Sequence, residues 1–319
     1  MSIKSLLTTA AATGALIASS FAVQAQERIV LKSAKSTSSY YVMMVQLSEM
    51  LKQRGDFSPT VEESQGSVQN VSESAVRPGN FLFTTPPSLL TLAAEGKGPF
   101  EGTEPFDNAR TLFAMPFVTI HFVARADSGV QMMSDFAGKT IIGGGVGTFC
   151  ESRTKAVLNA LGLSDKVTLI DVENNAINAA VRNGKVDGYS DCNSHPSTSS
   201  VELASTTDLV FVDLSQDERD TVINLDPLSG PITIAAGTYK GQSDDVNTVG
   251  VPVGAYGTTA MSDTVAYTIT KTFWEQKDAL AGDQRWWNGV STDLVKLLGA
   301  KVHPGAAKYY EEAGIQFSE

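Results

Sequence analysis

Three histidines and two cysteines are the side chains of this sequence best suited to metal binding or nucleophilic catalysis. His121, His195 and His303 lie 74 and 108 residues apart, and no HxxxH, HxH or CxxC spacing is found near them. Metal ligands usually recur at such short spacings, so a metal site is not supported. The sequence also has no GxSxG elbow and no Walker lysine loop. We therefore expect no enzymatic activity, no metal and no cofactor.

The two cysteines, Cys150 and Cys192, leave two interpretations open. In an exported protein an even pair is first considered as a disulfide, and closing a loop of 42 residues would stabilise the fold by about 4 kcal/mol. Alternatively, Cys150 lies at the predicted start of a helix, where the dipole would acidify a catalytic thiol. No Cys/His signature supplies a base for that thiol.

A glycine loop at residues 143–147 precedes a predicted helix. It misses the dinucleotide-binding fingerprint because Thr148 stands where the third glycine is required. Its backbone N–H groups, delivered to the start of a capped helix, would suit an anion such as a carboxylate. The glycines would equally allow a tight strand-to-helix turn without any ligand. Both readings stay open.

A second polar loop, residues 35–40, also precedes a helix and is rich in hydroxyl groups. Lys35 in this loop is a candidate counter-charge for an anionic ligand, although lysines in loops are usually solvated. His195 is a candidate donor to the ligand, although a histidine in the interior more often bonds to the backbone.

The elements that would position these residues follow one pattern twice. Short apolar runs alternate with helical patterns in the order β-α-β-α-β, which predicts a largely parallel sheet flanked by helices. In the first half, Ser39 would cap the first helix and Gly55 would end it; in the second half, Thr148 would cap the helix, Glu151 would complete a capping box and Gly162 would follow its end. The first half has strands at 28–32, 57–63 and 81–84 and helices at 41–54 and after Gly66, and the second has strands at 139–142 and 167–172 and helices at 148–161 and 177–181.

Two long extended runs, residues 117–125 and 249–259, are predicted to cross between the halves. We therefore expect a two-lobed α/β protein, in which each lobe is a mostly parallel sheet flanked by helices and two crossover strands join the lobes and act as a hinge. Lobe I would comprise residues 26–122 and 252–319, and lobe II residues 123–251. Strand-to-helix loops of both lobes would face one cleft. Trp274, Trp286 and Trp287 are expected to pack in the core.

The first 25 residues are predicted to be a secretory signal peptide. Lys4 precedes a mostly apolar stretch that ends in Val23-Gln24-Ala25, a small-x-small cleavage pattern, which indicates that the protein is exported and the peptide removed. An uncleaved anchor is the alternative, and no other segment is apolar and long enough to span a bilayer. The whole chain has a net charge of −11. An acidic chain without a basic block is not expected to bind nucleic acid.

Five strings, in this order along the chain, resemble the TAXI family of solute-binding proteins of TRAP transporters. They are the polar loop ending in Tyr40-Tyr41, ESQGSVQN at 63–70, ARADSG at 124–129, AGTYKGQ at 236–242, and HPGA at 303–306 followed by Tyr309-Tyr310. The resemblance spans essentially the whole chain after the signal peptide, and it implies a two-lobed α/β fold of the type II periplasmic-binding-protein kind.

The resemblance implies a monomeric periplasmic receptor that captures a small organic acid, either a glutamate-like amino acid or a dicarboxylate, and delivers it to fused small and large TRAP membrane subunits. This chain departs from the family at Lys35, Ser38 and Ser39, where glycines are usual, and at Ser194-His195 before Pro196. A sensory or scaffold protein of the same fold and a secreted hydrolase are the alternatives. By position, the binding loops of the family fall on Ser36, Thr37, Tyr40, Gly66, Ser67, Thr84, Thr85, Gly147, Thr148 and Phe149.

Overall fold

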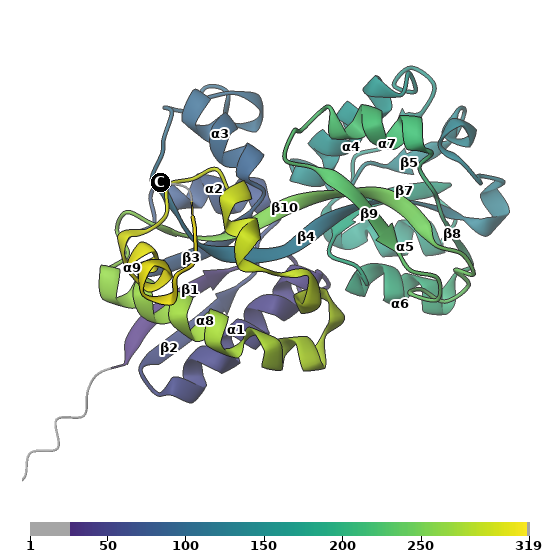
Figure 1. The fold of residues 1–319 in the computed structure, drawn as a ribbon. Coiled ribbons are helices and arrows are strands. Elements are labelled where there is room, and N and C mark those ends of the chain that lie inside the picture. The colour runs from purple at the N-terminus through teal and green to yellow at the C-terminus, as the bar shows by residue number, and fades with distance from the viewer. Residues whose placement is uncertain (1–25, 318–319) are drawn as a thin grey trace, which may run out of the picture.

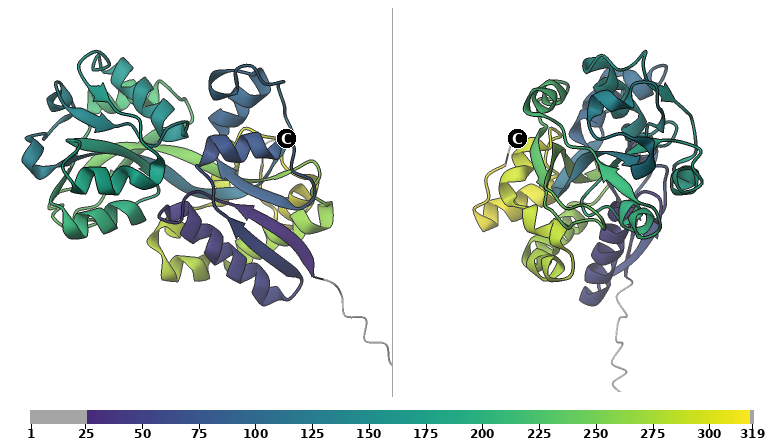
Figure 2. Two further views of the ribbon diagram at one scale, coloured as in Figure 1. Left: turned by 180° about the vertical axis from the view of Figure 1, so that it is seen from behind. Right: turned by 90° about the vertical axis from the view of Figure 1, so that its right-hand side faces the viewer.

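Two lobes joined by two long strands make up the molecule. The computed structural model describes residues 26–317, and the predicted signal peptide, residues 1–25, lies outside the described residues. The connecting strands are β4 (Ala109–Arg125) and β10 (Val246–Thr258), which run side by side from one lobe into the other (Figure 1). The views from behind and from the side show the same two bodies (Figure 2). The predicted two-lobed α/β fold class is thus confirmed.

The first lobe is built on three parallel strands in the order β2-β1-β3. β10 extends this sheet antiparallel to β3, and β4 pairs antiparallel with β10. The strands are β1 (Glu27–Lys32), β2 (Phe57–Glu62) and β3 (Phe81–Thr85), and the helices are α1 (Ser39–Arg54), α2 (Ser67–Ser74), α3 (Pro87–Glu95), α8 (Asp263–Asp283) and α9 (Pro304–Ala313), with 3-10 turns at Gly98–Phe100, Arg285–Gly289 and Thr292–Leu297. The tail after β10 therefore completes the first lobe, with α8 packed against α1 and α9.

The second lobe continues the same sheet from β4 through β7 to β5 and β6. β5, β6 and β7 are parallel, whereas β8 pairs antiparallel with β4 and β9 pairs antiparallel with β10. The strands are β5 (Thr140–Ile142), β6 (Thr168–Leu169), β7 (Gly188–Asn193), β8 (Leu209–Phe211) and β9 (Gly230–Ile234), and the helices are α4 (Phe149–Ala160), α5 (Ile177–Arg182), α6 (Thr198–Thr206) and α7 (Gln216–Ile223), with 3-10 turns at Ala126–Ser128, Met133–Phe136 and Asn174–Ala176.

The helix starts differ from the sequence-based expectation in two details. Ser38, not Ser39, caps α1: its hydroxyl oxygen accepts the Tyr40 N–H at 3.2 Å. Thr148 caps α4 as predicted and accepts the Glu151 N–H at 3.2 Å, but the Glu151 carboxylate bonds the Gly147 N–H instead of closing a capping box on Thr148. The expected strand at 167–172 shortens to β6 at the edge of the sheet, where the Ile170 N–H still donates to the Ile141 carbonyl at 3.0 Å.

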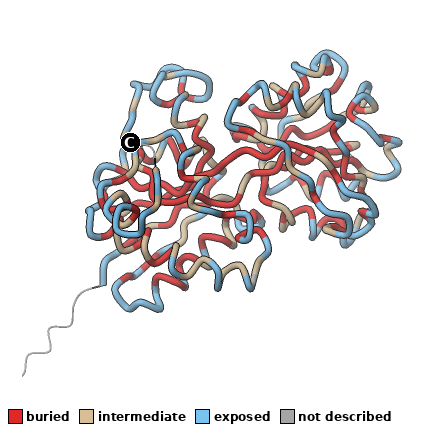
Figure 3. Tube along the Cα trace, viewed as in Figure 1, coloured by how far each residue is buried: buried red, intermediate tan, exposed pale blue. Residues whose placement is uncertain are grey.

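Buried residues follow the crossover strands through the whole molecule (Figure 3). The predicted lobe boundaries, 122/123 and 251/252, fall inside β4 and β10, which are mostly buried. The register between β4 and β10 shifts near Val251 and Val253, so the pairing is irregular at the predicted hinge. Trp287 is fully buried in the larger core cluster and Trp286 nearly so, and Trp274 is partly buried and packs against that cluster. Within the described residues, no helix has the length and apolar character that a membrane span requires.

Candidate functional site

A cleft between the lobes lies at several of the predicted binding loops. Its volume is about 750 Å³, a figure that includes space open to solvent. Side chains of both lobes line it. The first lobe supplies the loops that follow β1 and β2 and the end of β3, while the second supplies the start of α4, the turn before α5, and β7. The residues that line it include Lys35, Ser38, Tyr40, Gly66, Ser67, Thr84, Gly144, Thr148, Phe149, Asn174, Asn178, Ser190, Asp191, Asn193 and Ser199. The cleft therefore lies where strand ends of the two lobes meet, as the topology predicts.

Lys35 crosses this cleft. Its ammonium group, on the loop after β1, donates a hydrogen bond to the backbone oxygen of Asn174 in the second lobe at 3.0 Å. Burial lowers the pKa of Lys35 below its ordinary value, while the charge of Asp191 opposes that shift. Among the side chains that the structure describes, Lys35 takes part in no ion pair, since its ammonium meets only a carbonyl. A cation held this way lacks the counter-ion that a partly buried charge favours.

Residues at the start of α1 form hydrogen bonds between the two lobes. The Ser38 hydroxyl donates to the side-chain oxygen of Asn193 at 2.6 Å, and the Ser39 hydroxyl donates to the backbone oxygen of Ser194 at 3.1 Å. The Tyr40 hydroxyl donates to the Pro116 carbonyl at 2.5 Å, on the crossover strand. Hydroxyl groups of the predicted polar loop thus bridge the lobes as well as lining the cleft.

The structure brings most, but not all, of the predicted binding residues to the cleft. Ser36 and Thr37 are exposed on the outer part of their loop, and Thr85 is buried with its hydroxyl on the Pro86 carbonyl at 3.2 Å. Gly147 is exposed, and its N–H is taken by the Glu151 carboxylate at 2.6 Å. The predicted residues that line the cleft are Lys35, Tyr40, Gly66, Ser67, Thr84, Thr148 and Phe149.

The glycine loop serves close packing at two of its positions. A side chain on Gly145 would lie 2.6 Å from the Asn174 Cβ and 2.7 Å from its Cα, and one on Gly144, where φ is +96°, would lie 2.5 Å from the Cys150 Cβ. Gly144 alone of residues 143–147 lines the cleft. The tight-turn explanation therefore accounts for Gly144 and Gly145. The anion-binding explanation depends on the N-terminus of α4 at Thr148.

His195 lies apart from the cleft, in a second cavity on the other face of β4. Phe117 lines this second cavity and its neighbour Val118 lines the cleft, because successive side chains of a strand point to opposite faces. The His195 Nδ1 is 2.7 Å from the Thr119 hydroxyl, and burial together with the nearby His121 lowers the His195 pKa to about 4. Within residues 26–317, no cluster of His, Cys, Asp and Glu has the geometry to hold a metal ion.

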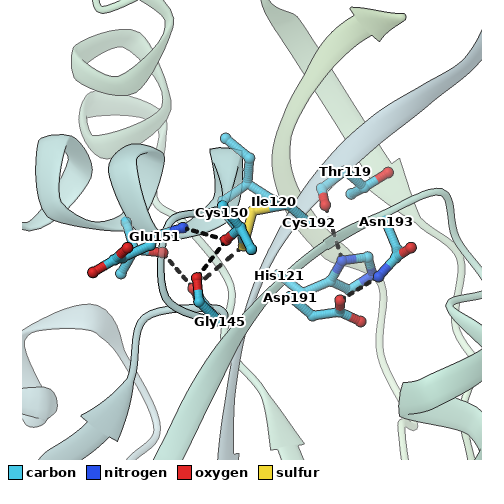
Figure 4. Close-up of a disulfide and its surroundings, with 12 residues drawn as sticks. Thr119, Ile120, His121, Gly145, Cys150, Glu151, Asp191, Cys192 and Asn193 are labelled. Carbon is cyan, nitrogen blue, oxygen red and sulfur yellow. Dashed lines mark hydrogen bonds between the residues drawn. A yellow bond between two sulfur atoms is a disulfide. The ribbon is translucent and has the colours of Figure 1, made fainter. Parts of the chain in front are cut away.

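Cys150 and Cys192 are joined by a disulfide in the wall of the cleft (Figure 4). The sulfur atoms are 2.11 Å apart and the Cα atoms 5.4 Å apart, so the bond ties the first turn of α4 to β7. A sulfur in a disulfide is not a thiolate nucleophile. This arrangement gives no support to the cysteine-hydrolase alternative.

Asp191 is the cleft residue that sequence reasoning missed most clearly. It lies on β7 beside Cys192 and is 7% exposed (Figure 4). Its Oδ2 accepts hydrogen bonds from Ser197, from Ser199 at 3.3 Å and from Ser200 at 2.9 Å, and its Oδ1 accepts one from the Asn193 amide at 2.5 Å. Burial alone would raise the pKa of Asp191. The nearby His121 and Lys35 and the hydrogen bonds to the carboxylate have the larger combined effect and lower the pKa below its ordinary value. The cleft therefore holds an ionised carboxylate.

Comparisons with known proteins agree with this architecture. The structure resembles the periplasmic binding protein BugD, with a TM-score of 0.54, 16% sequence identity, and coverage of 91% of this chain and 99% of BugD. It is similarly related to MatC from Rhodopseudomonas palustris with bound malate, with a TM-score of 0.54, 16% identity, and coverage of 90% and 97%. At such identities the likeness shows the two-lobed fold alone. The family model described as the NMT1-like family matches residues 31–314, nearly all of the described residues, and the chain belongs to that family.

Proposed function

We propose that this protein is the periplasmic solute receptor of a TRAP transporter of the TAXI type. It binds a small carboxylate, a glutamate-like amino acid or a dicarboxylate, between its lobes and delivers it to fused membrane subunits. No bond of the ligand is altered, and the protein works as a monomer without a cofactor. Lobe I comprises residues 26–122 and 252–319, and lobe II residues 123–251.

The observation that carries this proposal is Lys35, an ammonium group that spans the cleft and bonds only to the Asn174 carbonyl among the described residues. A ligand carboxylate is the natural counter-ion for such a cation. The N-terminus of α4, at Thr148, also faces the cleft, and the positive end of the helix dipole there favours an anion. Hydroxyls and amides from both lobes complete a polar lining for a small polar molecule.

Two further points support the receptor role. The TAXI resemblance covers the chain from the polar loop to Tyr310. The structural neighbour MatC is described with malate bound, which is a small dicarboxylate. A signalling receptor of the same fold would bind ligand equally well, and membrane transport subunits encoded beside this gene would favour transport.

A thermal-shift screen tests the proposal. The protein without residues 1–25 would be heated with C4 to C6 dicarboxylates and with amino acids. A ligand at 100 times its dissociation constant should stabilise the folded state by about 2.7 kcal/mol. The absence of a shift with every compound would refute the proposed ligand class, and turnover of a compound would refute the receptor role.

A further inference from the structure

Asp191 places a negative charge in a cleft that is proposed to bind an anion. Its carboxylate is buried, it lines the cleft, and its lowered pKa keeps it ionised. An ionised carboxylate in the wall of an anion site repels a ligand that carries only negative charge. The binding of a carboxylate alone therefore does not explain why Asp191 lines this cleft.

The hydrogen bonds of Asp191 leave one acceptor position open. Oδ2 is occupied by three serine hydroxyls at the start of α6, whereas Oδ1 accepts only the Asn193 amide among the described residues. A carboxylate oxygen has two lone pairs, so Oδ1 can accept another donor. No Lys, Arg or His side chain forms an ion pair with Asp191 within residues 26–317.

Lys35 and Asp191 are near each other without forming a pair. Each shifts the pKa of the other through its charge, yet the Lys35 ammonium bonds to Asn174 and not to the carboxylate. Lys35 comes from the first lobe and Asp191 from the second, and both line the same cleft. The cleft thus presents one separated cation and one separated anion.

We propose that Asp191 forms an ammonium subsite opposite Lys35, so that the ligand is a zwitterion: its carboxylate pairs with Lys35 and its cationic amine donates to Asp191 Oδ1. This inference rests on the proposed function and narrows it to amino acids. A dicarboxylate without an amine would bring a second negative charge toward Asp191.

Matched ligand pairs that differ only in amine against hydroxyl test the inference. Isothermal titration would compare L-glutamate with (S)-2-hydroxyglutarate and L-aspartate with L-malate, on the protein without residues 1–25. The amino member of at least one pair should bind at least about tenfold more tightly, the lower end of the effect of losing one partner of a buried charge pair. Equal or tighter binding of the hydroxy acids would overturn the inference but leave the proposed function intact. Binding of none of the four would overturn the inference if the thermal screen finds only dicarboxylate ligands, and a screen in which no dicarboxylate or amino acid binds would refute the proposed ligand class as well.

Two variants separate recognition from a structural role of Asp191. Asp191→Asn keeps an oxygen acceptor for the serines but removes the charge, and should reduce the amine preference to about threefold or less. Ser200→Ala removes one hydroxyl from the same carboxylate, at a residue outside the cleft lining, and keeps the charge of Asp191, so the preference should remain. If Asp191→Asn folds, as judged by its melting curve, and retains the full preference, Asp191 acts only in the structure. If it does not fold, the ligand pairs on the unchanged protein decide the question.

Discussion

Lys35 is the residue on which ligand charge should depend most directly. Lys35→Ala removes the cation that crosses the cleft, and affinity for a small carboxylate should fall by at least about tenfold because a charge-assisted hydrogen bond is lost. The loss should be larger at low salt than at high salt. Titration of the ligand found in the thermal screen, at two salt concentrations, measures both effects.

Thr37→Ala is the matched control, because Thr37 belongs to the same loop but is exposed and does not line the cleft. The affinity of Thr37→Ala for the ligand should equal that of the unchanged protein. Equal affinity of Lys35→Ala at both salt concentrations would dismiss the role of the lysine.

The lowered pKa of Lys35 predicts how binding depends on pH. The charged form binds the anion, so affinity should decline as pH rises, with a midpoint below the ordinary lysine pKa of 10.5. Lys35→Arg keeps its charge throughout this range. The difference between the two pH profiles therefore isolates Lys35 from any titration of the ligand's own amine, and identical profiles would contradict the assignment.

The sequence pointed to some cleft residues and not to others for a physical reason. Lys35, Tyr40 and Thr148 stand in strand-to-helix loops, whose position in an α/β sheet can be predicted. Asp191 and Asn193 lie within a short strand and belong to no local motif. Their role depends on partners such as Ser38, which lies 155 residues from Asn193 in the chain. Only the folded topology reveals such pairs.

At the scale of elements, the glycine loop before α4 packs against the turn of the same lobe that carries the acceptor of Lys35. Gly145 allows the Asn174 backbone to pass within van der Waals contact, and the Asn174 carbonyl is the acceptor that Lys35 reaches. Gly147 has a positive φ of +70° but nothing within 4 Å of a Cβ placed there. These two glycines therefore predict different consequences of the same substitution.

Gly145→Ala should displace Asn174, lower the free energy of unfolding by about 1–3 kcal/mol and weaken ligand binding by at least about threefold. Gly147→Ala should cost about 1–2 kcal/mol through backbone strain alone and leave affinity nearly unchanged. Urea unfolding and ligand titration on both variants measure the two quantities. Unchanged affinity in Gly145→Ala would show that the Asn174 contact does not shape the binding site.

The alternation of strands and helices in the sequence predicted β1 to β3, α1 and α2 of the first lobe, β5, β6, α4 and α5 of the second, and both crossovers, but not α3, α6 or α7. It did not predict β8 and β9, which are short strands that pair with β4 and β10 at positions distant in the chain. Their pairing exists only once the crossovers have formed, so no local pattern marks them. Long strands with buried residues on both faces, in contrast, give a strong signal in the sequence.

For the whole molecule, the contacts across the cleft require that the lobes separate when a ligand enters. The Lys35 ammonium donates to the Asn174 carbonyl and the Ser38 hydroxyl donates to the Asn193 side-chain oxygen, so these two hydrogen bonds join the lobes across the cleft. The irregular register of β4 with β10 lies at the predicted hinge, where small changes of backbone angle would rotate one lobe against the other. Because the ligand must enter an open form before the lobes close over it, we expect the ligand-free protein to be more open than the complex. Small-angle scattering should then give a smaller radius of gyration with saturating ligand than without it. Ser38→Ala, which removes one of these contacts and the cap of α1, should shift the ligand-free protein further toward the open form. Identical scattering with and without ligand would mean that the cleft binds as a rigid pocket and that the crossover strands do not act as a hinge.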